Sequence, residues 1–118
     1  IRLVPLNAKD KAVTRVKGAS RLRTDLVLAA NELAEPGQKT IYVCITSPDG
    51  YVLSTPEAAS FTFEGEPKIY SAAREVEYTN SDLEVSVFYN GSGFTAGTYH
   101  IELYTDGRLI GSTDVALR

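Results

Sequence analysis

Apolar residues recur at every second position over most of this chain, and this period constrains the fold more than any other feature. The segment 83–89 reads LEVSVFY, with apolar side chains at alternate positions. Segments 99–103 (YHIEL) and 41–45 (IYVCI) repeat the pattern. A period of two places successive side chains on opposite faces of a strand, whereas a helix needs a period near 3.6. The chain therefore predicts half-buried strands.

Turn-forming residues separate these segments. Asp106-Gly107 lies between the alternating segments 98–104 and 108–117. A type I′ turn needs positive φ angles, which Asp-Gly tolerates, so this pair predicts a hairpin. The tetrapeptide 47–50 (SPDG) predicts a second turn, from which 51–53 returns. On the strand 108–117 we expect one face to carry Leu109, Val115 and Leu117.

The remaining strands are less regular. Phe61 and Phe63 mark a short strand, and 69–78 predicts one or two more. Segments 1–6 and 11–16 flank the polar residues 7–10 and predict a first hairpin, in which Pro5 belongs at an edge or a bulge.

Segment 20–34 leaves two interpretations open. A helix capped by Ser20 would align Leu22, Leu26, Ala29 and Leu33. A strand would instead place four residues on one face, namely Leu22, Thr24, Leu26 and Leu28. The period-two pattern elsewhere favours the strand.

About eight or nine short strands, with turns every 8–12 residues, predict an all-β, immunoglobulin-like antiparallel two-sheet sandwich. We expect one domain over 1–118, in which 1–16 is a lead-in hairpin from an absent N-terminal region of a longer protein. Gly97 precedes Tyr99 by two residues, as in the tyrosine corner of such sandwiches. Tyr99 is therefore expected to hydrogen-bond the backbone a few residues upstream.

The formal net charge of −3 offers none of the basic excess that nucleic-acid binding requires, so no nucleic-acid partner is expected. The first 23 residues differ, because they hold seven basic residues and only one acid, Asp10. They would either form a phosphate-binding patch or protect solvated strand edges. The seven are Arg2, Lys9, Lys11, Arg15, Lys17, Arg21 and Arg23.

Candidate catalytic and metal-binding residues are few. His100 is the only histidine and Cys44 the only cysteine, whereas a structural zinc site uses four such ligands. We expect His100 to be an exposed strand residue and Cys44 a packed thiol. Asp49 and Asp106 precede glycine and are explained by turn formation. The sequence thus predicts a protein that is not an enzyme, with no catalytic, cofactor-binding or metal-binding residues.

Tyrosine is the residue type that most suggests binding. Tyrosine is enriched at protein interfaces, although it also favours strands for structural reasons. Five tyrosines are candidates for one outer sheet face, and three of them, Tyr42, Tyr51 and Tyr104, form the predicted interaction surface. The other two are Tyr70 and Tyr78.

Two stretches resemble a known family: 31–42 (NELAEPGQKTIY) continuing through 48–53 (PDGYVL), and 97–107 (GTYHIELYTDG) with Ile110-Gly111. They are similar to the C-terminal β-domain of bacterial uncharacterised proteins in which a membrane anchor and a long coiled coil precede this domain. Some members are labelled chromosome-partitioning or segregation-like. The resemblance implies a parent protein that is anchored and oligomeric through the coiled coil. It slightly favours the periplasmic side of the cell envelope and leaves the cytoplasm open.

Three functions follow as expectations. The leading one is a non-enzymatic interaction domain that binds a protein or envelope partner through a sheet face or an exposed edge strand. A carbohydrate- or glycan-binding module is the alternative, and it would need a concave face with coplanar aromatic rings beside carboxylates. A structural cap of the coiled coil is the third. No membrane contact by the domain itself is expected, because no 18-residue apolar run is present.

Overall fold

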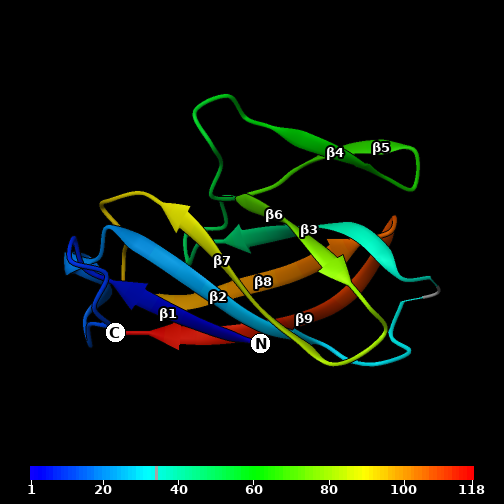
Figure 1. The fold of residues 1–118 in the computed structure, drawn as a ribbon. Coiled ribbons are helices and arrows are strands. Elements are labelled where there is room, and N and C mark those ends of the chain that lie inside the picture. Colours follow the sequence, from blue (N-terminus) through cyan, green and yellow to red (C-terminus); the bar gives the residue numbers. More distant parts are fainter. Residues whose placement is uncertain (34) are drawn as a thin grey trace.

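The computed structural model describes residues 1–33 and 35–118. These residues form nine strands and one 3₁₀ turn, with no α-helix among them (Figure 1). The elements are β1 (Arg2–Leu6), η1 (Val16–Gly18), β2 (Arg21–Leu28), β3 (Gly37–Thr46), β4 (Ser60–Phe63), β5 (Glu66–Ile69), β6 (Ala72–Tyr78), β7 (Leu83–Asn90), β8 (Gly97–Thr105) and β9 (Arg108–Leu117).

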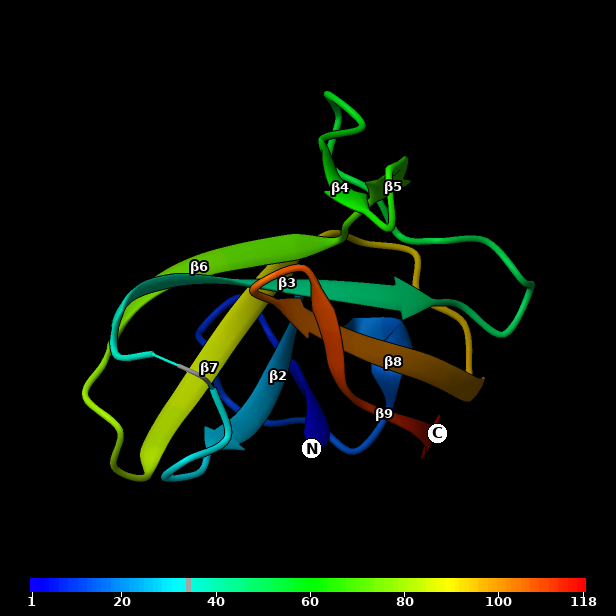
Figure 2. The same ribbon diagram turned by 90° about the vertical axis from the view of Figure 1, so that its right-hand side faces the viewer.

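The strands form two packed antiparallel sheets and a separate hairpin. One sheet has the order β1-β2-β7, and the other has the order β6-β3-β8-β9. The hairpin of β4 and β5 stands outside the sandwich, above β6 and β3 (Figure 2). The predicted all-β sandwich is therefore confirmed.

The core lies between the inner faces of the two sheets. On β3, Ile41, Val43 and Ile45 are fully buried, as their alternation predicts. On β2, the buried side chains are Leu22, Thr24, Leu26 and Leu28. The strand interpretation of segment 20–34 is thus confirmed over Arg21–Leu28, and the helical one is wrong. Ala34, the last residue of that segment, lies outside the described residues.

Two local predictions are also confirmed. Asp106 and Gly107 have φ angles of 53° and 70°, as the turn between β8 and β9 requires. Tyr99 is buried, and its hydroxyl donates a 2.6 Å hydrogen bond to the carbonyl of Thr95, four residues upstream. This bond ties the loop before β8 to the core.

The predicted first hairpin is shorter than expected. Leu6 and Ala12 form a single antiparallel bridge, and the Val13 N–H donates to the Pro5 carbonyl. The chain then turns into η1, so segment 14–16 does not continue the hairpin. The main partner of β1 is β2. Pro5 therefore lies on an edge strand, as predicted.

The expected face of β9 is wrong at one residue. Tyr104 pairs with Leu109 and Leu103 pairs with Gly111, so Ile110 is an additional, bulged residue. A bulge reverses the side-chain alternation beyond it. Leu109 consequently lies on the outer face and is 47% exposed, while Val115 and Leu117 pack against the core.

We expect the substitution Tyr99→Phe to lower the free energy of unfolding by about 1 kcal/mol, because it removes one buried hydrogen bond. Urea unfolding followed by circular dichroism measures the change. The matched control is Tyr51→Phe, whose ring is 76% exposed and which should change stability by less than about 0.5 kcal/mol. Equal unfolding midpoints for the two variants would contradict a structural role for the Tyr99 hydroxyl.

Candidate functional site

The three tyrosines predicted to form an interaction surface do not share one open surface. Tyr42 on β3 and Tyr104 on β8 are cross-strand neighbours on the outer face of the four-stranded sheet. Tyr104 is only 2% exposed, however, and Tyr42 is half-buried. Tyr51 is well exposed in the loop after β3, and no aromatic contact among the described residues joins it to the other two.

The other two candidate tyrosines also separate. The Tyr70 ring lies 5.1 Å from that of Tyr42. Tyr78 is buried in the core, where its hydroxyl donates to the carbonyl of Ala29 at 2.8 Å. The sequence pattern placed Tyr78 with the other four because it does not reveal which face of β6 turns inward.

The β4–β5 hairpin covers Tyr42 and Tyr104. Phe61 stacks on Tyr42 with ring centroids 4.4 Å apart, and Phe63 packs edge-on against Tyr104 at 4.8 Å. The Lys68 ammonium lies 5.3 Å from the Tyr104 ring centroid. The protein's own rings thus occupy the face on which a sugar would have stacked.

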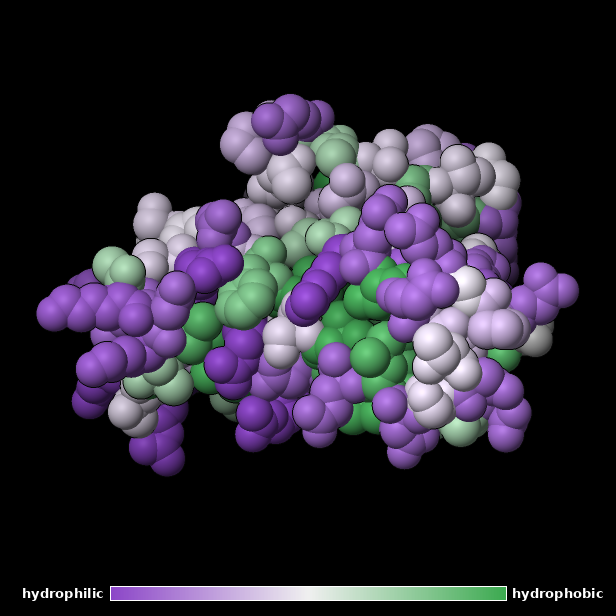
Figure 3. All heavy atoms as spheres, viewed as in Figure 1, coloured by the Kyte–Doolittle hydropathy of each residue, from purple (hydrophilic) through white to green (hydrophobic). Residues whose placement is uncertain are grey.

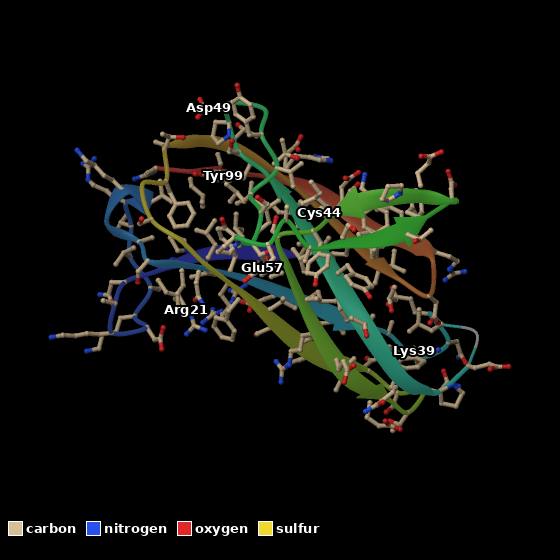
Figure 4. All side chains as sticks on the ribbon, turned by 90° about the horizontal axis from the view of Figure 1, so that it is seen from above. Arg21, Lys39, Cys44, Asp49, Glu57 and Tyr99 are labelled. Atoms are coloured by element: carbon tan, nitrogen blue, oxygen red, sulfur yellow. The ribbon has the colours of Figure 1, made fainter. Side chains whose placement is uncertain are left out.

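Cys44 lies beneath the same hairpin (Figure 4). Its thiol donates to the Ile69 carbonyl at 3.4 Å, and the residue is 3% exposed. Burial raises the pKa of this thiol from the usual 9.0 to about 11. The prediction of a packed thiol is confirmed.

His100 is partly exposed on the outer face of β8. Its Nδ1 lies 2.6 Å from the Asp114 carboxylate, and its Nε2 lies 3.8 Å from that of Glu102. Among residues 1–33 and 35–118, no group of three or more His, Cys, Asp or Glu side chains is arranged to hold a metal ion.

Three of the seven basic residues near the start of the chain are paired with carboxylates. Arg2 and Arg23 both contact Asp25, at 3.0 and 2.9 Å, and Arg21 contacts Asp10 at 2.9 Å. Burial by itself would raise the pKa of Asp25, but hydrogen bonds from Ser86, Arg2 and Arg23 outweigh it and lower that pKa below its usual value. The other four basic residues lie in the segment 7–18, between β1 and β2.

A cavity of about 600 Å³ opens beside β2 at the start of β1, and we call it the groove. Apolar side chains from both sheets line it, and apolar surface is visible between charged side chains on this face of the molecule (Figure 3). These side chains include Ile1, Leu26, Val85, Leu103 and Ile110. The groove therefore exposes the edge of the core between the two sheets.

The groove is also bordered by the open edge of a sheet. Strand β9 pairs only with β8 among the described strands. Backbone groups of successive residues in an antiparallel strand point to opposite neighbours. The carbonyl of Val43 accepts from Ser71 and so points away from β8, and Leu103, opposite Val43, directs its backbone groups toward Gly111 of β9. Ser112, the next residue of β9, therefore directs its N–H and C=O away from β8.

No backbone partner for Ser112 exists on this open side among the described residues. Ser112 was not predicted as a binding residue, because the period-two pattern of 108–117 indicates a strand but not its place at the edge of the sheet.

A smaller cavity of about 330 Å³ lies on the opposite side of the sandwich, and we call it the cleft. It is bounded by segment 55–57 and by β6 and β7. Three aromatic residues, Tyr70, Phe88 and Tyr89, line it together with Glu57 and Asn90. Aromatic rings beside a carboxylate and an amide can stack on a sugar and bind its hydroxyl groups.

The raised pKa of Cys44 predicts a pH dependence of stability. The folded state holds the thiol proton more tightly than the unfolded state. The contribution of the thiol to the free energy of unfolding is therefore fully present below pH 9 and is lost as the pH rises toward 11. From pH 8 to pH 10 we expect wild type to lose about 1 kcal/mol more than Cys44→Ala. Urea midpoints at both pH values measure the difference, and parallel losses would contradict it.

No curated protein and no solved structure matches this chain. No helix in the described part of the chain has the length and apolar character needed to cross a membrane. One family model does match, over residues 1–118, and nothing in that match links the chain to coiled-coil or chromosome-partitioning proteins. Because the match covers the full sequence, the chain belongs to the family described as "Domain of unknown function (DUF8428)".

Proposed function

We propose that this domain is a non-enzymatic interaction module that binds an extended segment of a partner protein in the groove. The observation that carries the proposal is the edge strand β9, where Ser112 directs its backbone donor and acceptor away from β8 without a partner among the described residues. An extended peptide that adds to a sheet edge gains main-chain hydrogen bonds from such groups.

The surroundings of β9 support the same function. Leu26, Leu103 and Ile110 offer apolar contacts to side chains that point into the groove beside it. Strand β9 is ten residues long, so its open edge can pair with an extended segment of several residues. Main-chain pairing would supply affinity, and the apolar contacts would supply specificity.

The immunoglobulin-like type of the sandwich, the nature of the parent protein and its location stay predictions. The Tyr99 hydrogen bond supports an immunoglobulin-like sandwich. The anchored coiled coil, the cell-envelope location and the structural-cap alternative depend on the resemblance described above.

Binding to an eight-residue peptide library with alternating apolar positions tests the proposed function. We expect Ser112→Pro to weaken binding about tenfold, because proline lacks the N–H that faces the open edge of β9 and one hydrogen bond is lost. Proline is tolerated at such a position because this N–H is outside the ladder with β8. Ser112→Thr keeps the N–H and should bind like wild type.

Circular dichroism of both variants checks that they remain folded. If no library peptide binds wild type, or if the folded Ser112→Pro variant binds as tightly as wild type, the proposed function is wrong.

The cleft supports glycan binding as a second candidate. Phe88 is 39% exposed there, and the Arg21 guanidinium lies 4.2 Å from its ring centroid, so a sugar would stack on the other face of the ring. Glu57 and the side-chain amide of Asn90 provide hydrogen-bonding groups, although Arg21 already donates to the Asn90 Oδ1. On a glycan array we expect Phe88→Ala to reduce any binding by about tenfold, since stacking on one ring is lost. Leu109→Ala, an exposed apolar residue on another strand, is the matched control. Equal binding by both variants would argue against the cleft.

A further inference from the structure

We infer that the segment bound along the edge of β9 carries a basic residue opposite Asp114, flanked by apolar residues that point inward. Recognition of this kind rests on the proposed function, because it uses the same edge, and it defines the chemistry of the partner. It follows from the register of β9 and from the charges on the outer face of its sheet.

The middle of the β9 edge is not in line with any other described segment. Among the described residues, the backbone contact on this edge is at its far end, where the Val16 N–H donates to the Arg118 carbonyl at 2.6 Å. Before η1 the chain pairs with β1, through Val13 and Pro5, and after η1 it enters β2. Strand β1 itself pairs with β2, so its line runs along β2 rather than along β9. The described chain therefore leaves the middle of this edge open.

The register of β9 determines which partner residues point outward. Ser112 directs its backbone groups to the open edge, and so do Asp114 and Ala116, at steps of two. Val115 packs against the core, so the Asp114 side chain points to the outer face of the sheet. Directly opposed residues of an antiparallel pair share a face. The partner residue opposite Asp114 in such a pair therefore points outward as well, and its two neighbours point inward.

The outward position faces negative charge. The Asp114 side chain is 66% exposed, and its Oδ1 lies 2.6 Å from Nδ1 of His100 on β8. No lysine or arginine among the described residues pairs with it. Glu102 is opposite Ser112 on the same face, and its Oε1 lies 3.8 Å from the Lys68 ammonium. Two carboxylates with one ammonium near them favour a basic partner residue beside this edge.

A basic side chain can reach Asp114 in more than one alignment of the partner. Directly opposed residues have Cβ atoms about 5 Å apart, and residues displaced by two positions are about 7–8 Å apart. The long stems of lysine and arginine span both distances, so a lysine opposite Ser112 or Ala116 also reaches this carboxylate. Arg118, the next basic residue along β9, is four positions away, or about 14 Å, beyond the screening length of about 8–10 Å.

The inward positions favour apolar side chains. Partner residues opposite Thr113 and Val115 share the inward face of β9, where Val115 packs against the core. Leu103 and Ile110 line the groove beside this strand. A charged side chain placed here would lose hydration without a compensating partner. The partner segment accordingly alternates an outward basic residue with inward apolar residues.

A second copy of this chain is a poorer occupant of the same edge. When the middles of two β9 strands pair antiparallel through these backbone groups, Asp114 of one copy lies opposite Asp114 or Ser112 of the other. The two Asp114 carboxylates are then directly opposed or diagonal neighbours, and like charges in these positions destabilise the pair. A basic segment replaces this repulsion with attraction.

Three fluorescent eight-residue peptides test this recognition. They share alternating leucine and serine, and they differ only in one central outward residue, which is lysine, glutamine or glutamate. Fluorescence anisotropy should show the lysine peptide binding wild type about three- to fivefold more tightly than the glutamine peptide, with the glutamate peptide weakest. Asp114→Asn should remove the preference for lysine, and Asp114→Lys should reverse it. Glu77→Gln, an exposed acid on β6 at the opposite edge of the same sheet, is the matched control and should retain it.

The outcomes separate this recognition from the proposed function. Equal binding of the three peptides by wild type, or an unchanged lysine preference in Asp114→Asn, would overturn the charge recognition while leaving groove binding in place. If Asp114→Asn keeps that preference and binds all three peptides more tightly, the carboxylate only protects the edge from pairing. A wild-type dimer in light scattering at low salt that is lost in Ser112→Pro would make a second copy the occupant instead. Failure of all three peptides to bind wild type at low salt would count against the proposed function itself.

Discussion

The packing of β2 against β3 is the interaction on which the rest of the structure depends. Leu22 and Leu26 from one sheet share one buried apolar cluster with Ile41, Val43 and Ile45 from the other, and the packing of this cluster holds the two sheets together. A sandwich of two separate sheets leaves two open sides, since neither sheet closes on itself. The groove and the cleft lie on these two sides. Both candidate sites are therefore consequences of the way the core is formed.

Much of the sandwich follows from local sequence. Alternation over 41–45 and 83–89 is read directly as strands, because each residue's face depends only on its own position in the pattern. The Asp106-Gly107 turn and the Tyr99 hydrogen bond are equally local, since their partners lie within a few residues. Features of this kind are accessible to sequence reasoning whenever the residue types are distinctive.

The features missed by the sequence analysis depend on partners distant in the chain. Phe61 marks a strand, but nothing near it indicates that its ring stacks on Tyr42. The bulge at Ile110 appears only when β9 is aligned with β8. The open edge beside the groove likewise appears only when the strand order is known, because the sequence of β9 does not indicate that this strand ends its sheet. Sheet register and the docking of a hairpin are tertiary properties.

The pairing of β2 with β7 also affects the order in which the fold can assemble. The ladder runs from Leu28 opposite Leu83 to Arg21 opposite Asn90. Strand β2, the central strand of its sheet, therefore pairs with residues more than 50 positions further along the chain. Closing such long loops costs chain entropy before the contacts form, and folding dominated by non-local strand pairing takes about milliseconds to seconds. During synthesis, β2 has no β7 partner until residues 83–90 have been added. The hairpin of β8 and β9, joined by two residues, can form as soon as it leaves the ribosome.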